Sequence, residues 1–159
     1  MRRLRTHRIL ISNSTAIRVN LSELKRVLRT LLELYEQPAQ EVSVLVTDRD
    51  GIRAMNRDFR QIDEPTDVLT FVAAPNPAQI LGDIAIAVDV AQSQADQRGI
   101  PLQQEMVYLA LHGGLHLMGL DDETESEQAE MIAEMNRIAR LMGYPEDPKW
   151  QTLSEVAHG

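Results

Sequence analysis

The spacing of apolar residues along the chain changes between two periods. Runs with apolar residues at every second position predict β-strands, whereas apolar residues three or four positions apart predict amphipathic helices. By this criterion strands are expected at 7–11, 16–19, 41–47, 68–72 and 83–88. Helices are expected from 21 to just before Pro38, and at about 51–60, 89–98, 101–118 and 123–142.

Capping signals place several of these helix ends. Asn20, with Glu23 three residues later, resembles a capping box. Asp50 is the expected N-cap of the second helix, and Gly99 the expected C-cap of the third. The second helix is expected to turn three apolar residues inward: Ile52, Met55 and Phe59.

Strands interleaved with helices predict an α+β fold of α/β-like character, with a small mixed β-sheet of about four strands packed by about five helices. The 159 residues suit a single domain spanning 1–159. Periodicity is lost from Glu146, so residues 146–159 are expected to form a mobile tail.

Composition excludes several classes of protein. The chain is 43% hydrophobic and 25% charged, as in ordinary soluble domains, and no apolar run approaches the roughly 20 residues of a membrane span. It has no cysteine, which excludes disulfides, thiolate metal sites and a cysteine nucleophile. The basic N-terminus precedes too short an apolar stretch for a signal peptide. We therefore expect a cytoplasmic protein with no membrane partner.

The net charge of −8 argues against indiscriminate coating of nucleic acid, which depends on neutralising phosphates. The charge is segregated, however. Acidic residues crowd the segment 121–134, whereas Arg53, Arg57 and Arg60 recur at helical spacing. A local basic track on an acidic body is compatible with this pattern, as is a simple solvated face.

The segment 111–122 carries the strongest chemical signal. His112 and His116 are four residues apart, which on a helix places their Cβ atoms about 5–6 Å apart, so that both imidazoles can bind one metal ion. Gly119 permits a turn that brings Asp122, ten residues after His112, back toward the pair. Two histidines and an aspartate form an acceptable zinc ligand set with one position open.

Two glycines follow the first histidine within the same expected helix. Gly113 and Gly114 each cost about 1 kcal/mol relative to alanine, and such a cost indicates a packing or functional reason. Close approach of a strand backbone or of a substrate would supply one.

Asp122 has a second candidate role. Residues 122–125 also fit a capping box for the last helix, with Asp122 as its N-cap. Asp121 could serve equally in either role, so spacing alone leaves the third ligand open.

The segment 112–122 resembles the signature of the YbeY family of metal-dependent endoribonucleases, His-Gly-x-Leu-His-Leu-x-Gly-x-Asp-His, except that Asp122 replaces the final histidine. Two earlier blocks follow the family in the same order. They are 56–71, with its Asn-Arg-Asp-Phe-Arg and Thr-Asp-Val-Leu-Thr-Phe pieces, and Leu-Gly-Asp-Ile at 81–84.

The resemblance implies a zincin-like site and cleavage of single-stranded RNA in 16S rRNA 3′-end maturation and ribosome quality control. It implies single-stranded RNA, rRNA and the ribosomal subunit as partners, with no DNA expected. Carried over by position, His112, His116 and Asp122 would bind one divalent metal, most readily Zn²⁺, and Arg60 would lie near it. Aspartate offsets one unit of metal charge that histidine would leave, so we expect weaker activity or a preference for harder ions.

The expected reaction is phosphodiester hydrolysis by a metal-activated water, with Arg60, His112 and His116 as the catalytic set. The Arg60 guanidinium would balance charge on the reacting phosphate. Its alternative role is a salt bridge to one of three carboxylates: Asp63, Asp67 or Asp83.

Two other functions compete with the nuclease. A zinc metallopeptidase would need a glutamate directly after the first histidine as its general base, but Gly113 stands there, and no other base is evident. A non-catalytic, RNA-binding ribosome-assembly factor with a weakened metal site is the other alternative. His7 and His158 are expected at the surface, and Tyr108 in the core.

Overall fold

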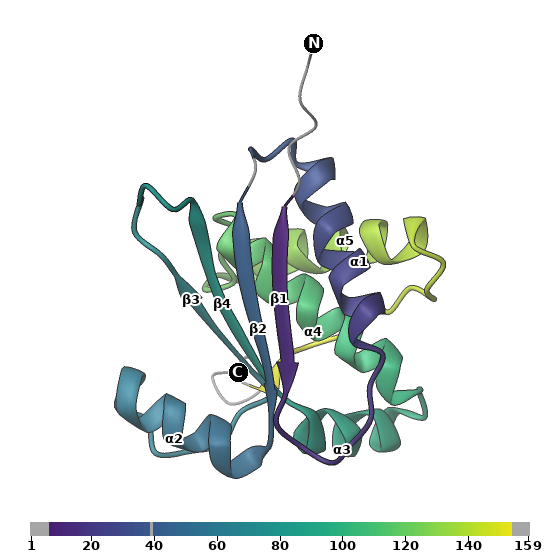
Figure 1. Ribbon diagram of the computed structural model, residues 1–159. Coiled ribbons are helices and arrows are strands. Elements are labelled where there is room, and N and C mark those ends of the chain that lie inside the picture. Colours follow the sequence, from purple (N-terminus) through teal and green to yellow (C-terminus); the bar gives the residue numbers. More distant parts are fainter. Residues whose placement is uncertain (1–6, 39, 154–159) are drawn as a thin grey trace.

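The computed structural model of the protein describes residues 7–38 and 40–153. Four strands and five helices lie within them (Figure 1). The strands are β1 (Arg8–Asn13), β2 (Glu41–Thr47), β3 (Val68–Val72) and β4 (Ile80–Ala87). The helices are α1 (Leu21–Leu34), α2 (Arg49–Arg60), α3 (Val88–Arg98), α4 (Leu102–Leu117) and α5 (Glu125–Leu141). None of these helices is long and apolar enough to cross a membrane.

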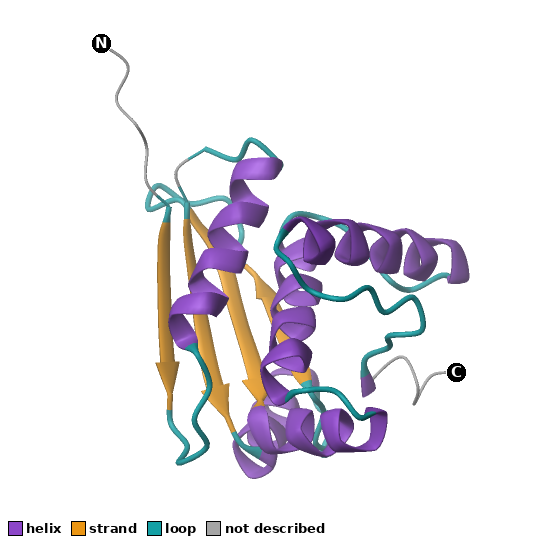
Figure 2. Cartoon of the chain, turned by 90° about the vertical axis from the view of Figure 1, so that its right-hand side faces the viewer, coloured by secondary structure: helices purple, strands orange, loops and turns teal. Residues whose placement is uncertain are grey.

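The sheet has the order β1-β2-β4-β3 and is mixed, as the sequence predicts. β1, β2 and β4 run parallel, and β3 pairs antiparallel with β4 at one edge. Helices α1 and α4 cover one face of the sheet, with α5 packed beyond α4, whereas α2 lies at one end of the other face (Figures 1 and 2). The main core lies between the sheet and the layer formed by α1 and α4.

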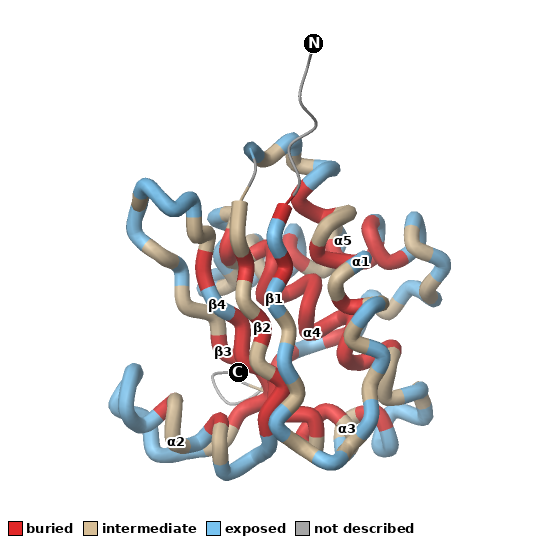
Figure 3. The backbone as a smooth tube through the Cα atoms, in the orientation of Figure 1, coloured by how far each residue is buried: buried red, intermediate tan, exposed pale blue. Residues whose placement is uncertain are grey.

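Helix α4 is buried on almost every side, and its tube is nearly continuously red in Figure 3. A Cβ atom on Gly113 would lie 2.9 Å from Cγ2 of Ile84 in β4, and one on Gly114 would lie 2.5 Å from Cδ2 of Leu31 in α1. Both distances are too short for a real contact. The two glycines are therefore explained by packing, because they let α4 fit between the sheet and α1.

The structure corrects two of the expected elements. Residues 16–19 form no strand, because the Asn13 side chain holds a turn by donating to the Ile17 carbonyl at 2.8 Å and accepting from the Thr15 amide at 2.9 Å. Helix α2 is capped by Asp48, which accepts from the Gly51 amide at 2.8 Å, and not by Asp50.

Side-chain placement also departs from expectation at two aromatic positions. Phe59 does not turn inward but is 68% exposed, since the last turn of α2 projects beyond the sheet edge (Figure 1). His7 is buried instead of exposed, and its Nδ1 accepts from the Gln40 amide at 3.3 Å. Tyr108 lies in the core, as predicted. His158 lies outside the described residues.

The aperiodic segment after Glu146 is packed in place as far as Leu153, contrary to the mobility expected for it. Trp150 is buried, its indole N–H donates to Glu105 of α4, and the Leu153 amide donates to Oδ2 of Asp67 at 2.8 Å. Tertiary contacts, which periodicity does not report, hold this segment against α4. Residues 154–159 of the expected tail lie outside the described part.

The tight contact at Gly113 predicts the effect of adding one methyl group. Gly113→Ala should lower the free energy of unfolding by about 1–2 kcal/mol, because overpacking costs about 1–3 kcal/mol and outweighs the helix propensity gained. Denaturant unfolding followed by circular dichroism measures this change. Ser93→Ala, at an exposed position of α3, gains propensity without the clash and is the control. A Gly113→Ala protein as stable as the wild type would contradict the packing argument.

Candidate metal centre

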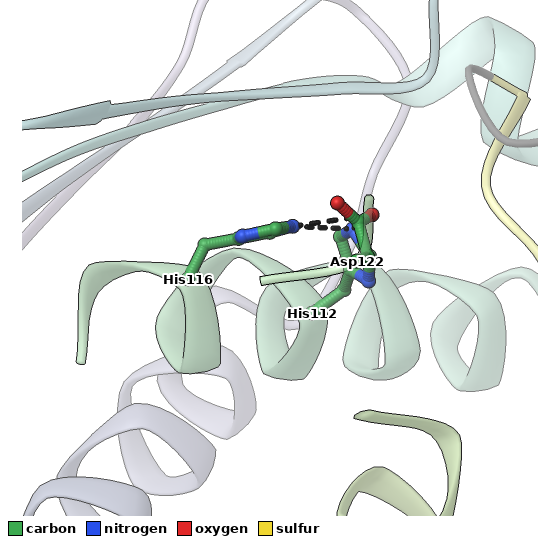
Figure 4. Close-up of side chains that lie close together, drawn as sticks. All are labelled: His112, His116 and Asp122. Atoms are coloured by element: carbon green, nitrogen blue, oxygen red, sulfur yellow. Dashed lines mark hydrogen bonds and ion pairs between the residues drawn. The ribbon is translucent and has the colours of Figure 1, made fainter. Parts of the chain in front are cut away.

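Helix α4 presents His112 and His116 one turn apart, with their Nε2 atoms 3.1 Å from each other. Gly119, at φ 99°, takes a positive-φ conformation just after the helix, and the chain then turns back. This turn brings Asp122 over the pair, with its Oδ2 atom 3.3 Å from Nε2 of each histidine (Figure 4). The structure thus brings together the three residues that the sequence singles out.

The spacing of these three atoms fits a single metal ion. All candidate ligand atoms of the cluster lie within 4.8 Å of one another. A tetrahedral zinc ion with bonds of about 2.0–2.1 Å holds its ligand atoms about 3.3–3.4 Å apart. The observed edges of 3.1, 3.3 and 3.3 Å are close to that triangle. Two imidazole nitrogens and one carboxylate oxygen can therefore hold a divalent ion with little rearrangement.

Asp122 does not cap the last helix, because other residues do so. The N-cap of α5 is Thr124, which forms a capping box with Glu127, so the capping box expected at 122–125 is wrong. The Gln128 side chain also holds the Asp122 carbonyl at 2.9 Å. Asp121 lines the same cavity but is not one of the three clustered residues.

The two histidines differ in their electrostatic surroundings. Burial lowers the pKa of His112 below its ordinary value, and the hydrogen bond with Asp122 only partly offsets that effect. Burial also opposes protonation of His116, but the Asp122 carboxylate more than compensates and raises the pKa of His116. The neutral imidazole that a metal ligand requires is therefore favoured at His112 and disfavoured at His116.

The C-terminal segment forms the support behind His112. The Trp150 ring lies 5.4 Å from the His112 ring, centroid to centroid. The indole is held by Glu105, a buried carboxylate that also pairs with Arg98 at 2.7 Å. Sequence reasoning missed this group, because Trp150 lies in a segment without periodicity. Its being the only tryptophan in the chain was the one available signal.

A cavity of about 320 Å³ opens beside the cluster. Arg60 lines it, as expected, and donates from Nη2 to the Thr70 carbonyl at 2.5 Å. The alternative salt bridges of Arg60 do not form within the described residues. Asp63 pairs with Arg53 at 2.8 Å, and Asp67 accepts from backbone amides, including that of Val68 at 2.8 Å.

Comparison with known proteins identifies the family and a similar solved fold. The family described as Endoribonuclease YbeY matches residues 10–143. The chain belongs to the YbeY family. Endoribonuclease YbeY of Synechococcus elongatus is 38% identical over 136 residues, which cover 80% of this chain and 76% of that protein. The Bacillus cereus protein of the same name is 37% identical, with 76% of this chain and 90% of that protein covered.

Coverage is lower for some relatives. The match to a Rhodopseudomonas palustris Endoribonuclease YbeY, at 41% identity, spans 67% of this chain and 60% of that protein. The solution structure of a Thermotoga maritima protein superposes with a TM-score of 0.58 over 90% of this chain and 99% of its own, at 23% identity. That likeness shows that the two chains share a fold.

The position of Trp150 beside His112 provides a spectroscopic test of the metal site. Titration with Co²⁺ should quench the tryptophan fluorescence and saturate at one equivalent, because the only indole lies against a ligand. His116→Ala should weaken this binding by at least about tenfold, since it removes one of three ligands. His7→Gln, which removes a histidine outside the cluster, is the control. Quenching that is unchanged in His116→Ala would show that the metal binds elsewhere.

Proposed function

We propose that this chain is a metal-dependent endoribonuclease that cleaves single-stranded RNA and acts in 16S rRNA maturation in the cytoplasm, in contact with the ribosomal subunit. The observation that carries the proposal is the triangle of His112, His116 and Asp122 beside a cavity that also contains Arg60. Membership of the YbeY family supports the reaction class.

His112, His116 and Asp122 would hold one divalent ion, and zinc suits their nitrogen and oxygen atoms best. When bound, such an ion supplies an activated water and polarises a phosphate oxygen. Arg60 would bind the phosphate on the other side of the cavity. Its bond to the Thr70 carbonyl orients the guanidinium, which matches phosphate in bidentate fashion and balances the charge that develops there.

The charge of the cavity links RNA binding to metal binding. Three carboxylates line it, Asp121, Asp122 and Glu123, against the single guanidinium of Arg60. With the cluster empty, this wall repels phosphate. A divalent cation offsets this excess of negative charge and places positive charge at the ligands, so the residues present favour RNA only in the metal-loaded protein.

The structure adds an argument against a metallopeptidase. The Cβ position of Gly113 points at Ile84 in the core and not into the cavity. A glutamate at this position would clash with Ile84, which disfavours the general base of protease-type zincins here.

Cleavage of a short single-stranded RNA tests the proposal. The zinc-loaded chain should cut it, a chelator should abolish cutting, and His116→Ala should be inactive. Arg60→Ala should lower kcat by about 10²–10³-fold, as removal of a transition-state donor does, and Arg60→Lys should recover part of the loss. Gel analysis of end-labelled RNA gives the rates.

The competing functions predict other results in the same assay. Intact RNA together with binding to ribosomal subunits would identify a non-catalytic assembly factor. Cleavage of casein with intact RNA would identify a peptidase. Either outcome would refute the nuclease.

The aspartate at the third position predicts a gain from one substitution. Asp122→His should raise the zinc-dependent cleavage rate severalfold and reduce any preference for Mn²⁺ over Zn²⁺, because a neutral imidazole leaves the full metal charge to attract phosphate. Cleavage rates with each metal measure the change. Asp121→His, one residue earlier and outside the cluster, is the matched control. A slower Asp122→His enzyme would show that the carboxylate contributes to catalysis.

A further inference from the structure

An aromatic pair, of which one ring is exposed and the other half-buried, lies across β3 from the metal cavity. Phe59 of α2 and Phe71 of β3 pack edge to face, with ring centroids 5.4 Å apart. Phe59 is 68% exposed, the most of any large apolar residue in the described part of the chain, and Leu10, which lines the same surface hollow, is 45% exposed. Exposed apolar groups gathered in this way indicate a surface that binds something.

The aromatic pair borders a hollow on the sheet face opposite α4. This hollow measures about 620 Å³. Besides the two rings, its lining includes apolar Leu10 and Leu45 and three polar residues: Ser12, Ser43 and Asp83. Helix α2 packs on this face, where Ile52 shares a small apolar cluster with Val90 of α3.

Edge strand β3 joins this surface to the metal cavity. Successive side chains of a strand point to opposite faces, so Thr70 lines the metal cavity while Phe71 lines the hollow. Arg60 links the two sides, since its guanidinium carbon lies 5.4 Å from the Phe71 ring centre and the same side chain lines the cavity. An RNA strand bound at the metal cavity can therefore reach the two aromatic rings by passing around the single edge strand β3.

We propose that Phe59 and Phe71 form a stacking site for a base of the RNA strand cut at the metal cavity, which makes them positioning residues for the substrate. This inference rests on the proposed nuclease function. An unpaired base presents a flat apolar face that stacks on aromatic rings, and stacking of this kind contributes about 1–3 kcal/mol per base. Only a single strand exposes such a face, so the pair would also favour unpaired RNA over a duplex.

The charge of the surface fits a nucleic acid. Within the described residues Arg60 forms no ion pair, so its positive charge is available to a phosphate between the stacked base and the cavity. Arg53 and Arg57 lie farther back along α2, each paired with an aspartate. The serines of the hollow can hydrogen-bond base edges, which a purely apolar protein-docking surface would not require.

The test uses the metal-loaded full chain and a short single-stranded RNA. Phe59→Leu keeps an apolar side chain but removes the ring, and should raise KM at least about fivefold with little change in kcat. Phe59→Trp should retain the wild-type KM. Leu141→Ala, which alters a 60% exposed apolar residue at the end of α5, is the control and should leave both constants unchanged.

A second measurement separates stacking from a general effect of the substitution. RNAs that each carry one abasic nucleotide, placed at successive distances from the cleaved bond, should bind the wild type more weakly at one or two positions. For RNAs that are abasic at those positions, Phe59→Leu should cause no further loss of binding affinity, because the base and the ring act as a pair.

Each result decides between the two claims. The stacking site is overturned by an unchanged KM in Phe59→Leu, or by an equal loss of binding affinity for every abasic RNA. Neither result contradicts the proposed nuclease function. Unchanged RNA kinetics with lost binding to ribosomal subunits shows that the face binds a protein, which also overturns the stacking site. If the wild-type chain cleaves no RNA with any metal, the proposed function fails and the stacking site fails with it.

Discussion

The contact of α4 with the sheet on one side and α1 on the other determines where the two histidines point. The glycine at 113 brings the helix against Ile84, and the glycine at 114 brings it against Leu31. A helix held on both sides can neither roll nor slide without steric conflict in a close-packed core. His112 and His116 lie on the remaining face and are thereby directed at the cavity, and Asp122 completes the triangle because Gly119 ends the helix directly after them.

Local signals explain how much of this site could be predicted. The spacing of the histidines, the turn at Gly119 and the distance to Asp122 are all properties of one short segment, so the sequence predicts the cluster well. The mixed sheet and five helices follow equally from periodicity. Sequence patterns did not decide whether Asp122 is a metal ligand or a helix cap. Thr124 and Glu127 offer a second capping box two residues later, and only the folded structure shows which box forms.

The features that prediction missed depend on contacts between distant segments. Trp150 packs against His112 although it lies 38 positions away in the sequence, and the buried carboxylate of Glu105 on α4 holds its indole in place. Asp67 anchors the same C-terminal segment by accepting from the Leu153 amide, although it reads in the sequence as one more candidate partner for Arg60. Phe59 follows the helical spacing of Ile52 and Met55 and yet is exposed, since periodicity reports the face of a helix but not how far the sheet beneath it extends.

The position of β3 at the edge of the sheet gives these separate observations a common consequence. A central strand would isolate its two faces from each other, because neighbours on both sides would close the way around it. β3 has β4 on one side only, so Arg60 can extend from α2 to the Thr70 carbonyl and reach the metal cavity from the opposite face. The sheet order therefore allows one guanidinium to contact both surfaces, and it explains how an arginine of the metal cavity can come from a helix on the far side of the sheet from the histidines.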